Sequence, residues 1–319
     1  MSLFIARRLV QSLFLLLVAS LAAFSAVYLV GNPADLLIGP QSTEADKIAA
    51  MKDLGLDLPI WRQYLVFLGK IAGFDLGKSF QTAIPVSELF AKRLPATLEI
   101  TISAFAISLI GLPLGVIAGL NPKSLWSKTI ITGSIFGISL PPFWIGLMLI
   151  LVFSVTLGWL PSSGRGDTIT ILGTEWAFTG SGLARMMLPA ITLSLFNIAL
   201  LIRLARSGMQ EVMLMDYIKF ARAKGLFRRR IIWLHAMKNI LIPIVTIQGI
   251  ELANLLAGSI VVEQIFAYPG IGRLALDSIT NLDRPVLVAF VMFMVVAFAF
   301  INLLVDILYA IIDPRIRLE

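Results

Sequence analysis

The sequence predicts an all-α integral membrane protein with six transmembrane helices, and three observations lead to that fold class. Apolar residues make up 58% of the 319 residues and charged residues only 14%, whereas soluble domains are roughly 45–50% apolar and about 25% charged. Six apolar runs are long enough to cross a bilayer, and basic residues gather between alternate runs. We therefore expect a single transmembrane domain over 1–319.

The six apolar runs define the expected spans, because a spanning helix needs about 20 mostly apolar residues. They are 9–30, 97–120, 129–158, 188–206, 239–262 and 286–312. The first run follows Arg7 and Arg8 as in a signal peptide, but it exceeds the usual apolar length of about 7–15 residues. It is therefore expected to stay as helix 1 (1–30). The third run contains Pro141-Pro142, which should break or kink it.

The distribution of charge orients these spans, because inner loops of membrane proteins are enriched in Lys and Arg. With both termini inside, the inner segments carry 15 basic and 4 acidic residues, and the outer segments carry 11 basic and 12 acidic residues. The inner segments are 1–8, 121–128, 203–238 and 313–319, and the outer segments are 31–96, 159–187 and 263–285. This topology explains the pI of about 9.8 without a nucleic-acid partner.

The residue types present exclude several kinds of chemistry. With no cysteine and one histidine, His235, we expect no disulfide, no iron–sulfur cluster and no multi-histidine metal site. The stretch Gly77-Lys78-Ser79 resembles the end of a phosphate-binding loop, but Gly73 is one position too close to serve as its first glycine. Because no acid–base or nucleophile–base pair emerges, we expect neither catalysis nor a cofactor on this chain.

The outer segment 31–96 is amphipathic rather than apolar. Ser42 or Thr43 is placed to cap a helix through 44–54. The aromatic and apolar residues from Trp61 onward predict a second helix that lies in the membrane interface.

Glycines recur every four residues in two spans. Gly111, Gly115 and Gly119 lie in the second span, and Gly133 and Gly137 lie in the third. This spacing places them on one helix face and lets two backbones approach closely. Packing within the chain and contact with a partner subunit both fit the pattern.

The densest cationic segment lies at the inner face, between the fourth and fifth spans. A helix is predicted over 207–226, with Glu211 near its start, basic residues near its end and Gly225 supplying the C′ position. Ala221 and Ala223 make part of its surface small, which suits docking into a groove of another protein. An ordinary positively charged loop would explain the charge but not the alanines and the glycine.

Four stretches of the chain resemble one family of membrane proteins. They are EVMLMDYIKFARAKGL (211–226), PVSELFAKRLPATLE (85–99), VEQIFAYPGIGRLALDSITNLDRPVL (262–287) and NLLVDILYAIIDPRIR (302–317). They are similar to bacterial ABC-importer permeases of the dipeptide/oligopeptide/nickel branch, which are binding-protein-dependent transport system inner-membrane components. The cytoplasmic coupling loop of this family is called the EAA loop. Here Lys219-Phe220-Ala221 stands in place of Glu-Ala-Ala.

This resemblance implies a permease subunit that forms half of a translocation pathway across the bacterial inner membrane. The cargo would be a peptide or a similar small solute such as a nickel chelate. The implied division of the chain is a periplasmic segment over 31–96, a five-helix core over 97–312 with a coupling loop over 207–238, and a cytoplasmic tail over 313–319. The alternative is a secondary transporter, which would often carry carboxylates at mid-membrane; Glu251 lies deep in a span.

The resemblance also implies partners. These are a second homologous permease subunit, two cytosolic ATPase subunits that bind ATP and Mg, a periplasmic or lipid-anchored substrate-binding protein, and the surrounding membrane lipid. The residues implied to couple to an ATPase are Glu211, Asp216, Tyr217, Ala221, Ala223 and Gly225.

Two further groups of residues are expected to act in transport. Broken backbone at membrane depth must face protein or water, so the pathway is expected around the proline break. Its residues are Ser139, Pro141, Asn197, Gln248 and Asn254. An outer gate is expected where charged residues pair across the turn Tyr268-Pro269-Gly270, and its residues are Glu263, Arg273, Asp283 and Arg284.

Overall fold

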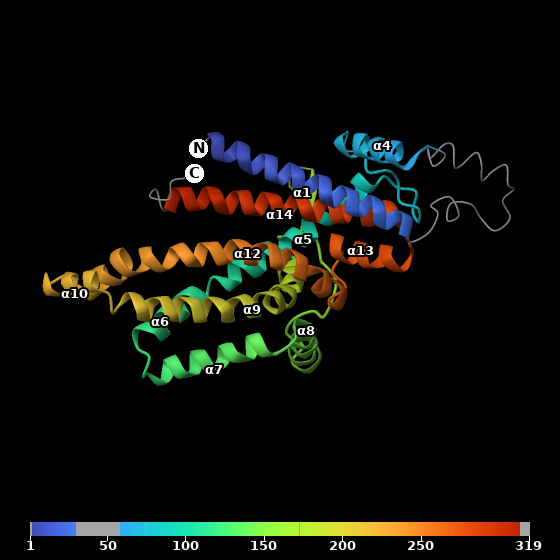
Figure 1. Ribbon diagram of the computed structural model, residues 1–319. Coiled ribbons are helices and arrows are strands. Elements are labelled where there is room, and N and C mark those ends of the chain that lie inside the picture. Colours follow the sequence, from blue (N-terminus) through green and yellow to red (C-terminus); the bar gives the residue numbers. More distant parts are fainter. Residues whose placement is uncertain (1, 30–57, 74, 172, 313–319) are drawn as a thin grey trace. The chain divides into compact units, whose positions relative to one another are not determined.

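The computed structural model describes residues 2–29, 58–73, 75–171 and 173–312 and is mostly helical (Figure 1). The chain forms two compact units, which are described separately. The first comprises Met1–Leu94 and Leu274–Ala299, and the second comprises Pro95–Arg273 and Phe300–Glu319. The helix predicted over 44–54 lies outside the described residues.

The first unit holds the N-terminal helix and the amphipathic helix predicted from Trp61 onward. Its elements are α1 (Ser2–Leu29), α4 (Ile60–Ala72), the beginning of α5 (Val86–Ser108), most of α13 (Ile271–Thr280) and the first half of α14 (Arg284–Ile312). Aromatic residues of α4 pack on α1. The hydroxyls of Tyr64 and Ser20 lie 2.9 Å apart, and the Phe24 ring contacts the rings of Tyr64 and Phe67. The second helix predicted in the outer segment is confirmed.

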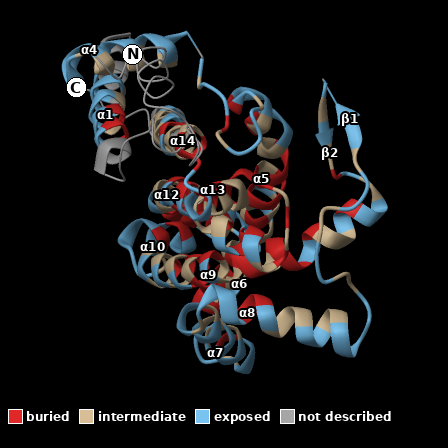
Figure 2. Ribbon diagram, turned by 90° about the vertical axis from the view of Figure 1, so that its right-hand side faces the viewer, coloured by how far each residue is buried: buried red, intermediate tan, exposed pale blue. Residues whose placement is uncertain are grey.

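The second unit is built around one long helix, α9. In chain order its elements are the end of α5, α6 (Gly111–Leu120), α7 (Leu125–Ser139), α8 (Pro142–Leu149), η1 (Ile150–Thr156), β1 (Ile169–Ile171), β2 (Thr174–Trp176), α9 (Gly180–Val212), α10 (Asp216–Ala223), α11 (Arg228–Arg230), η2 (Ile231–Ala236), α12 (Met237–Ile265), the start of α13 and the end of α14. Helices α6, α7, α8 and α12 all contact α9. Buried residues accordingly gather along it (Figure 2).

Glycines let α6 and α7 approach α9 closely. A Cβ atom at Gly111, Gly115 or Gly119 would lie 2.6, 2.6 or 2.8 Å from a backbone oxygen of α9, and one at Gly137 would lie 2.8 Å from another. Gly133 has no neighbouring atom within 4 Å. Packing within the chain therefore accounts for four of these five glycines.

Four helical stretches among the described residues are long and apolar enough to cross a membrane. They are Val86–Leu120, Gly180–Val212, Arg228–Ile265 and Arg284–Ile307. They coincide with the second, fourth, fifth and sixth predicted spans, but most extend further at their ends. The second begins at Val86 instead of residue 97. Lys92 and Glu88 pair across one helical turn at 2.7 Å, so the helix continues past the apolar run into polar sequence.

The third predicted span is broken, as expected, at its two prolines. Helix α7 ends at Ser139 and α8 begins at Pro142, and the two are bent by 109°. Leu140 and Pro141 have extended backbones, with ψ of 136° and 139°. Each of them precedes a proline, whose ring disfavours the helical conformation of the residue before it. The two halves together supply a fifth candidate span.

A small β-hairpin in the second unit departs from the predicted all-helical architecture. Strands β1 and β2 pair antiparallel, with Ile169 opposite Trp176 and Ile171 opposite Thr174. Strand β1 consists of β-branched residues and β2 contains Thr174 and Trp176; β-branched and aromatic side chains favour extended backbone. Helical periodicity and span length, on which the prediction rests, do not register two strands of three residues.

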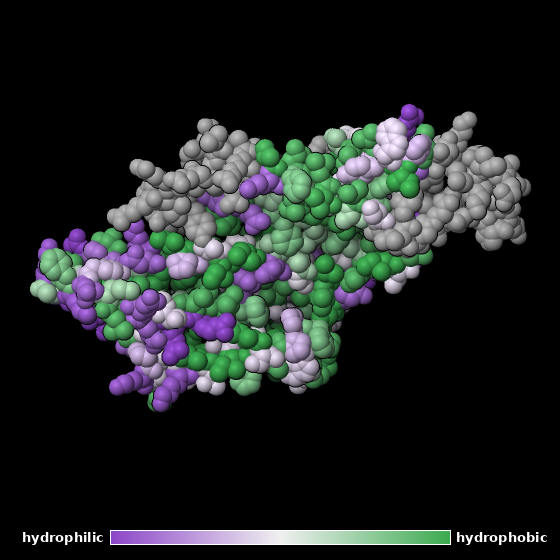
Figure 3. Space-filling model, in the orientation of Figure 1, coloured by the Kyte–Doolittle hydropathy of each residue, from purple (hydrophilic) through white to green (hydrophobic). Residues whose placement is uncertain are grey.

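Hydrophilic residues gather at one end of the second unit. They lie over α10 and over the turn between α6 and α7, whereas apolar residues cover the helices beyond them (Figure 3). This polar end contains α10, which lies in the segment 207–226 for which the sequence predicts a docking helix.

Candidate functional site

The helix predicted over 207–226 is two helices in the structure. Helix α9 continues to Val212, and α10 runs from Asp216 to Ala223. Between them Met215 is extended, with φ −66° and ψ 148°. The predicted boundary was therefore wrong, because helix propensity does not register the turn at 213–215. Glu211, predicted near the start of the helix, instead lies at the exposed end of α9.

The end of α10 is fixed by the predicted glycine. Gly225 has φ +75°, a conformation that glycine adopts without steric cost. The N–H of Gly225 donates to the carbonyl of Arg222 at 2.9 Å, and that of Leu226 donates to the carbonyl of Ala221 at 3.3 Å. These two bonds form a Schellman motif. Helix α10 thus has a defined C-terminal end.

Helix α10 has one face buried in its own chain. Ile218 is fully buried and Ala221 is 6% exposed, and both belong to a cluster with Met209 and Ile240. The expectation that Ala221 and Ala223 form one docking surface is therefore corrected. Ala221 is small because it meets this core, and only Ala223 is exposed.

The outward side of this segment carries four large, mostly apolar side chains, of which the sequence indicated only Tyr217 as a coupling residue. Leu214, Tyr217, Phe220 and Phe227 are 73%, 42%, 62% and 84% exposed, and we name these four residues the α10 patch. Lys224 lies over the Phe220 ring, 4.5 Å from its centroid. The side chains at 214, 217 and 220 recur every three residues, and this spacing is the sequence pattern from which the patch could have been predicted. Exposed apolar patches of this kind mark protein contacts.

The other two residues predicted for coupling are also exposed. Asp216 pairs with Lys219 at 2.8 Å on the surface of α10, and it places a carboxylate in the first turn, where the helix dipole favours negative charge. Tyr217 accepts a hydrogen bond from the side-chain amide of Asn239 in α12. Helix α10 is thus attached to α12 as well as to the core.

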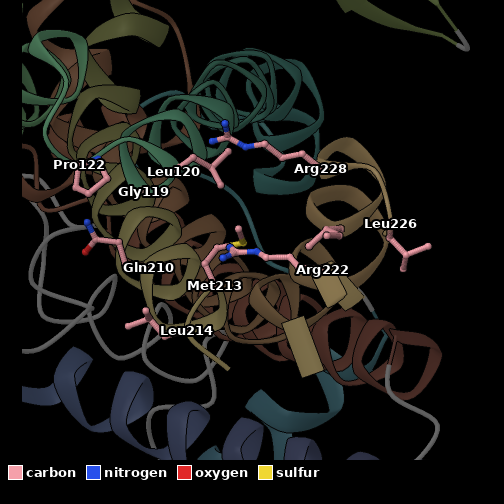
Figure 4. A pocket seen from close by; sticks show the side chains of 10 residues that line it. Gly119, Leu120, Pro122, Gln210, Met213, Leu214, Arg222, Leu226 and Arg228 are labelled. Carbon is pink, nitrogen blue, oxygen red and sulfur yellow. The ribbon is translucent and has the colours of Figure 1, made fainter. Parts of the chain in front are cut away.

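A cavity of about 780 Å³ lies behind α10. Its lining comes from the end of α6 and the turn after it (Gly119, Leu120, Pro122), from the end of α9 (Gln210, Met213, Leu214), and from α10 onward (Arg222, Leu226, Arg228, Ile231). Figure 4 shows the side chains of Arg222 and Arg228 extending across it, toward Met213 and Leu120 respectively. The cavity therefore pairs an apolar wall with two guanidinium groups.

The residues predicted to line a pathway divide into two sets. Asn197 and Gln248 are buried and exchange hydrogen bonds at 2.9 and 3.3 Å, and the Asn197 amide also donates to the Ser108 hydroxyl at 3.1 Å. They form a polar link between α5, α9 and α12. Ser139, Pro141 and Asn254 are instead exposed on the second unit.

One predicted gate residue, Glu263, organises the turn at the end of α12. It is fully buried, and its carboxylate accepts from the Thr97 hydroxyl at 2.6 Å and from the Arg273 backbone N–H at 2.8 Å. A Cβ atom at Gly270 would lie 2.3 Å from this carboxylate. The Glu263 carboxylate thus binds a hydroxyl and a backbone N–H, and it caps the beginning of α13.

The other two predicted gate residues belong to the first unit. Asp283 is 2% exposed and accepts from the Ser79 hydroxyl at 2.5 Å and from the Phe80 N–H at 3.1 Å. Arg284 follows it as the first residue of α14 and is 6% exposed. Asp283 thus fixes the 79–80 segment beside the start of α14.

A buried polar cluster that the sequence analysis missed centres on Glu99 of α5. Its carboxylate receives two hydrogen bonds from the Arg165 guanidinium, at 2.7 and 3.1 Å, one from the Tyr268 hydroxyl at 2.7 Å and one from the Ala177 N–H at 2.7 Å. Burial, together with the negative charge of Glu99, raises the pKa of Tyr268 and keeps its hydroxyl protonated as the donor. The turn predicted at Tyr268-Pro269-Gly270 was the one part of this cluster that the sequence indicated. Nothing in the spacing of Glu99 and Arg165 indicates their contact.

Two known families of membrane transport components match parts of this chain. Residues 111–318 match the family described as binding-protein-dependent transport system inner membrane component, and residues 1–101 match its N-terminal membrane component. A solved structure of the MetNI methionine ABC transporter in an inward-facing conformation has the same fold over 68% of this chain and 93% of its own. Its TM-score is 0.52 and its sequence identity 18%.

The similarity to curated relatives extends over the whole chain. The chain is 38% identical to the di/tripeptide transport system permease protein DppB of Pseudomonas aeruginosa and 37% identical to the dipeptide transport system permease protein DppB of Escherichia coli K12, with 98% of each chain covered. It is 38% identical to a putative peptide transport system permease protein of Brucella abortus, with full coverage. The fold and the similarity define a multi-pass inner-membrane permease subunit of an ABC importer, which is not itself an enzyme. The chain belongs to the family of binding-protein-dependent transport system inner membrane components.

Proposed function

We propose that this permease subunit imports di- or tripeptides and that α10 transmits the motion of a cytosolic ATPase to the membrane helices. The α10 patch carries the proposal. Its exposed side chains lie on and beside a short helix whose opposite face, through Ile218 and Ala221, is buried in the core around α9 and α12. A coupling element needs an exposed face that a partner subunit binds. It also needs a buried face that transfers its movement to the membrane helices. The peptide class rests on the names of the relatives.

The proposed assembly contains a second homologous permease, two ATPase subunits that hold ATP and Mg, and an external binding protein. This chain would contribute six spans, with α1 as the first and both termini inside. The charge distribution along the sequence supports that orientation. The hydrophilic end over α10 agrees with it, since the ATPases are cytosolic.

The test uses a charge in the α10 patch. Phe220→Asp should leave the permease in the membrane but abolish recovery of the ATPase subunits in a pull-down and uptake of a labelled dipeptide, because it places a carboxylate in a desolvated contact. Leu125→Asp is the matched control, since Leu125 is 78% exposed and begins α7. Normal recovery and uptake with Phe220→Asp would refute the coupling role. If the wild type recovers its ATPase subunits normally but takes up no dipeptide, only the proposed substrate is refuted.

We place the pathway beside the break at Pro141, with Ser139 and Asn254 on its wall and with Asn197 and Gln248 behind them. In this cysteine-free chain, cysteines introduced at Ser139 and Asn254 should react with a water-soluble thiol reagent. Protection of both positions in every transport state would exclude this assignment.

The outer gate expected from the sequence at Glu263, Arg273, Asp283 and Arg284 remains our proposal, and Asp283 is the residue at which it is tested. Asp283→Asn weakens the acceptor of the Ser79 and Phe80 hydrogen bonds. It should therefore change how strongly the binding protein stimulates ATP hydrolysis. An unchanged stimulated rate would argue against a gate at Asp283.

A further inference from the structure

A pocket of about 270 Å³ lies within the first unit, between α4, the 75–80 segment and the beginning of α14. Its apolar lining includes Phe67, Ile71, Phe80, Val288 and Ala289. Its charged lining is Lys70, Lys78, Arg284 and Asp75. The coupling role proposed for α10 makes no use of this pocket.

The charges around the pocket favour an anion. Three cationic side chains and one carboxylate line the pocket, and the Asp75 carboxylate already accepts a hydrogen bond from the Gly77 N–H at 3.0 Å. A second carboxylate, that of Asp283, lies buried in the wall and accepts hydrogen bonds from Ser79 and Phe80. Helix α14 begins at Arg284 and is 29 residues long, so its N-terminal end adds partial positive charge. Lys and Arg donors around a helix N-terminus are typical of phosphate recognition.

The pocket has a fixed wall. The hydrogen bonds from Ser79 and Phe80 to Asp283 hold the 79–80 segment against the residue that precedes α14. The N–H of Val86 donates to the carbonyl of Gly77 at 3.0 Å and closes the other side of this loop. The cationic and apolar groups are therefore held together before any ligand arrives, which lowers the entropy cost of binding.

Exposed apolar side chains surround the pocket on α4 and α14. On α4, Ile60, Trp61 and Leu65 are 66%, 59% and 56% exposed, as in an amphipathic helix lying on a bilayer. Helix α14 is a candidate span that starts at the pocket and exposes Val291 and Val296 further along. A ligand here meets cationic side chains beside apolar ones.

We propose that this pocket binds the phosphate of an anionic phospholipid headgroup, with the acyl chains lying against α4 and α14. The cations select the charge of the headgroup, and the apolar lining selects a lipid over a free phosphate ion. Basic pockets beside transmembrane helices recognise lipid headgroups by the same physics. The inference does not depend on which leaflet holds the pocket or on the solute that is transported.

The experiment measures lipid retention by the purified permease complex. The complex is equilibrated with equal amounts of phosphatidylglycerol and phosphatidylcholine, and the bound lipid is counted by native mass spectrometry. The wild type should retain phosphatidylglycerol preferentially. Lys70→Gln combined with Lys78→Gln should lower that retention by on the order of tenfold, because two cations near the phosphate are lost.

Two further variants separate the pocket from general surface charge. Arg62→Gln removes a cation from the same helix, but Arg62 lies over the Trp61 ring and does not line the pocket, so retention should be unchanged. Val288→Trp fills the pocket without altering charge, and it should lower retention as the double lysine variant does. Thermal unfolding of each variant confirms that the complex is intact.

Several outcomes would overturn the proposal. These are undiminished retention in the double lysine variant or in Val288→Trp, and an equal loss in Arg62→Gln. Displacement of the lipid by millimolar inorganic phosphate would assign the site to the free ion. Retention of phosphatidylcholine at the same level would mean that charge does not select the occupant.

Discussion

Tyr268 donates its hydroxyl to the Glu99 carboxylate at 2.7 Å, although 169 residues separate them in the chain. Both side chains are buried, and Arg165 joins the same carboxylate through two hydrogen bonds. The cluster links α5, the segment before the β-hairpin and the turn after α12. These three parts of the second unit are therefore held by one carboxylate.

Removing partners of Glu99 should destabilise the second unit in a graded manner. Tyr268→Phe removes one donor and should cost about 1–3 kcal/mol of unfolding free energy. Arg165→Ala leaves a buried carboxylate without its cation and should cost about 3–5 kcal/mol. Thermal unfolding of the detergent-solubilised permease complex measures both. Lys92→Ala is the control, because its pair with Glu88 is solvent-exposed and should contribute less than about 1 kcal/mol. Equal effects of all three would contradict a central role for Glu99.

The same cluster predicts a loss of stability in alkaline solution. Burial and the charge of Glu99 raise the pKa of Tyr268 in the folded chain. Its stabilisation is therefore complete below the ordinary tyrosine pKa of about 10 and declines as the pH rises further, because the unfolded chain then releases the proton first. The unfolding temperature of the wild type should fall faster above this pH than that of Tyr268→Phe. Parallel curves would exclude Tyr268 as the titrating group.

Two glycine variants should change stability in opposite directions. In Gly115→Ala the new methyl group would lie 2.6 Å from the Ile202 carbonyl oxygen and 2.7 Å from the Ala205 Cβ. Helices α6 and α9 must then separate, and overpacking of this kind costs about 1–3 kcal/mol. Gly133→Ala meets no atom within 4 Å and should stabilise α7 by up to about 1 kcal/mol. The yield and unfolding temperature of the purified complex report both. A neutral Gly115→Ala would disprove the close approach.

The Asn197–Gln248 pair should show strong coupling between its two members. Asn197→Leu leaves the buried Gln248 amide without its partner and should cost about 1–3 kcal/mol. Gln248→Leu should do the same to Asn197. The double variant removes both polar groups, so its cost should be well below the sum of the single costs. Additive losses in a double-mutant cycle would show that the two amides act independently.

The sequence predicted the features that depend on local pattern. Apolar run length located four candidate spans and the broken third one, the prolines located the break after Ser139, and Gly225 located the end of α10. The sequence did not predict features that depend on contacts between residues far apart in the chain. Ala221 has the same side chain whether it faces a partner or its own core, and only the packing of α10 on Ile240 decides between them. Likewise, Glu99 and Arg165 lie 66 residues apart, and no periodicity relates them.

The bend at Pro141 has a consequence for how the subunit is made. Where α7 and α8 separate, Pro141 and Pro142 have no N–H, so the carbonyls of Gly137 and Ile138 have no backbone donor four residues on. Ser139 and Pro141 are exposed on the unit that carries them. Hydrocarbon cannot solvate such carbonyls, so at membrane depth they need cover from protein or from water. If the proposed partner permease supplies that cover, a newly inserted copy without it displays a polar defect inside the bilayer. This is a mark by which quality-control proteases could distinguish orphan subunits from assembled ones, and it would tie the lifetime of this chain to the supply of its partner.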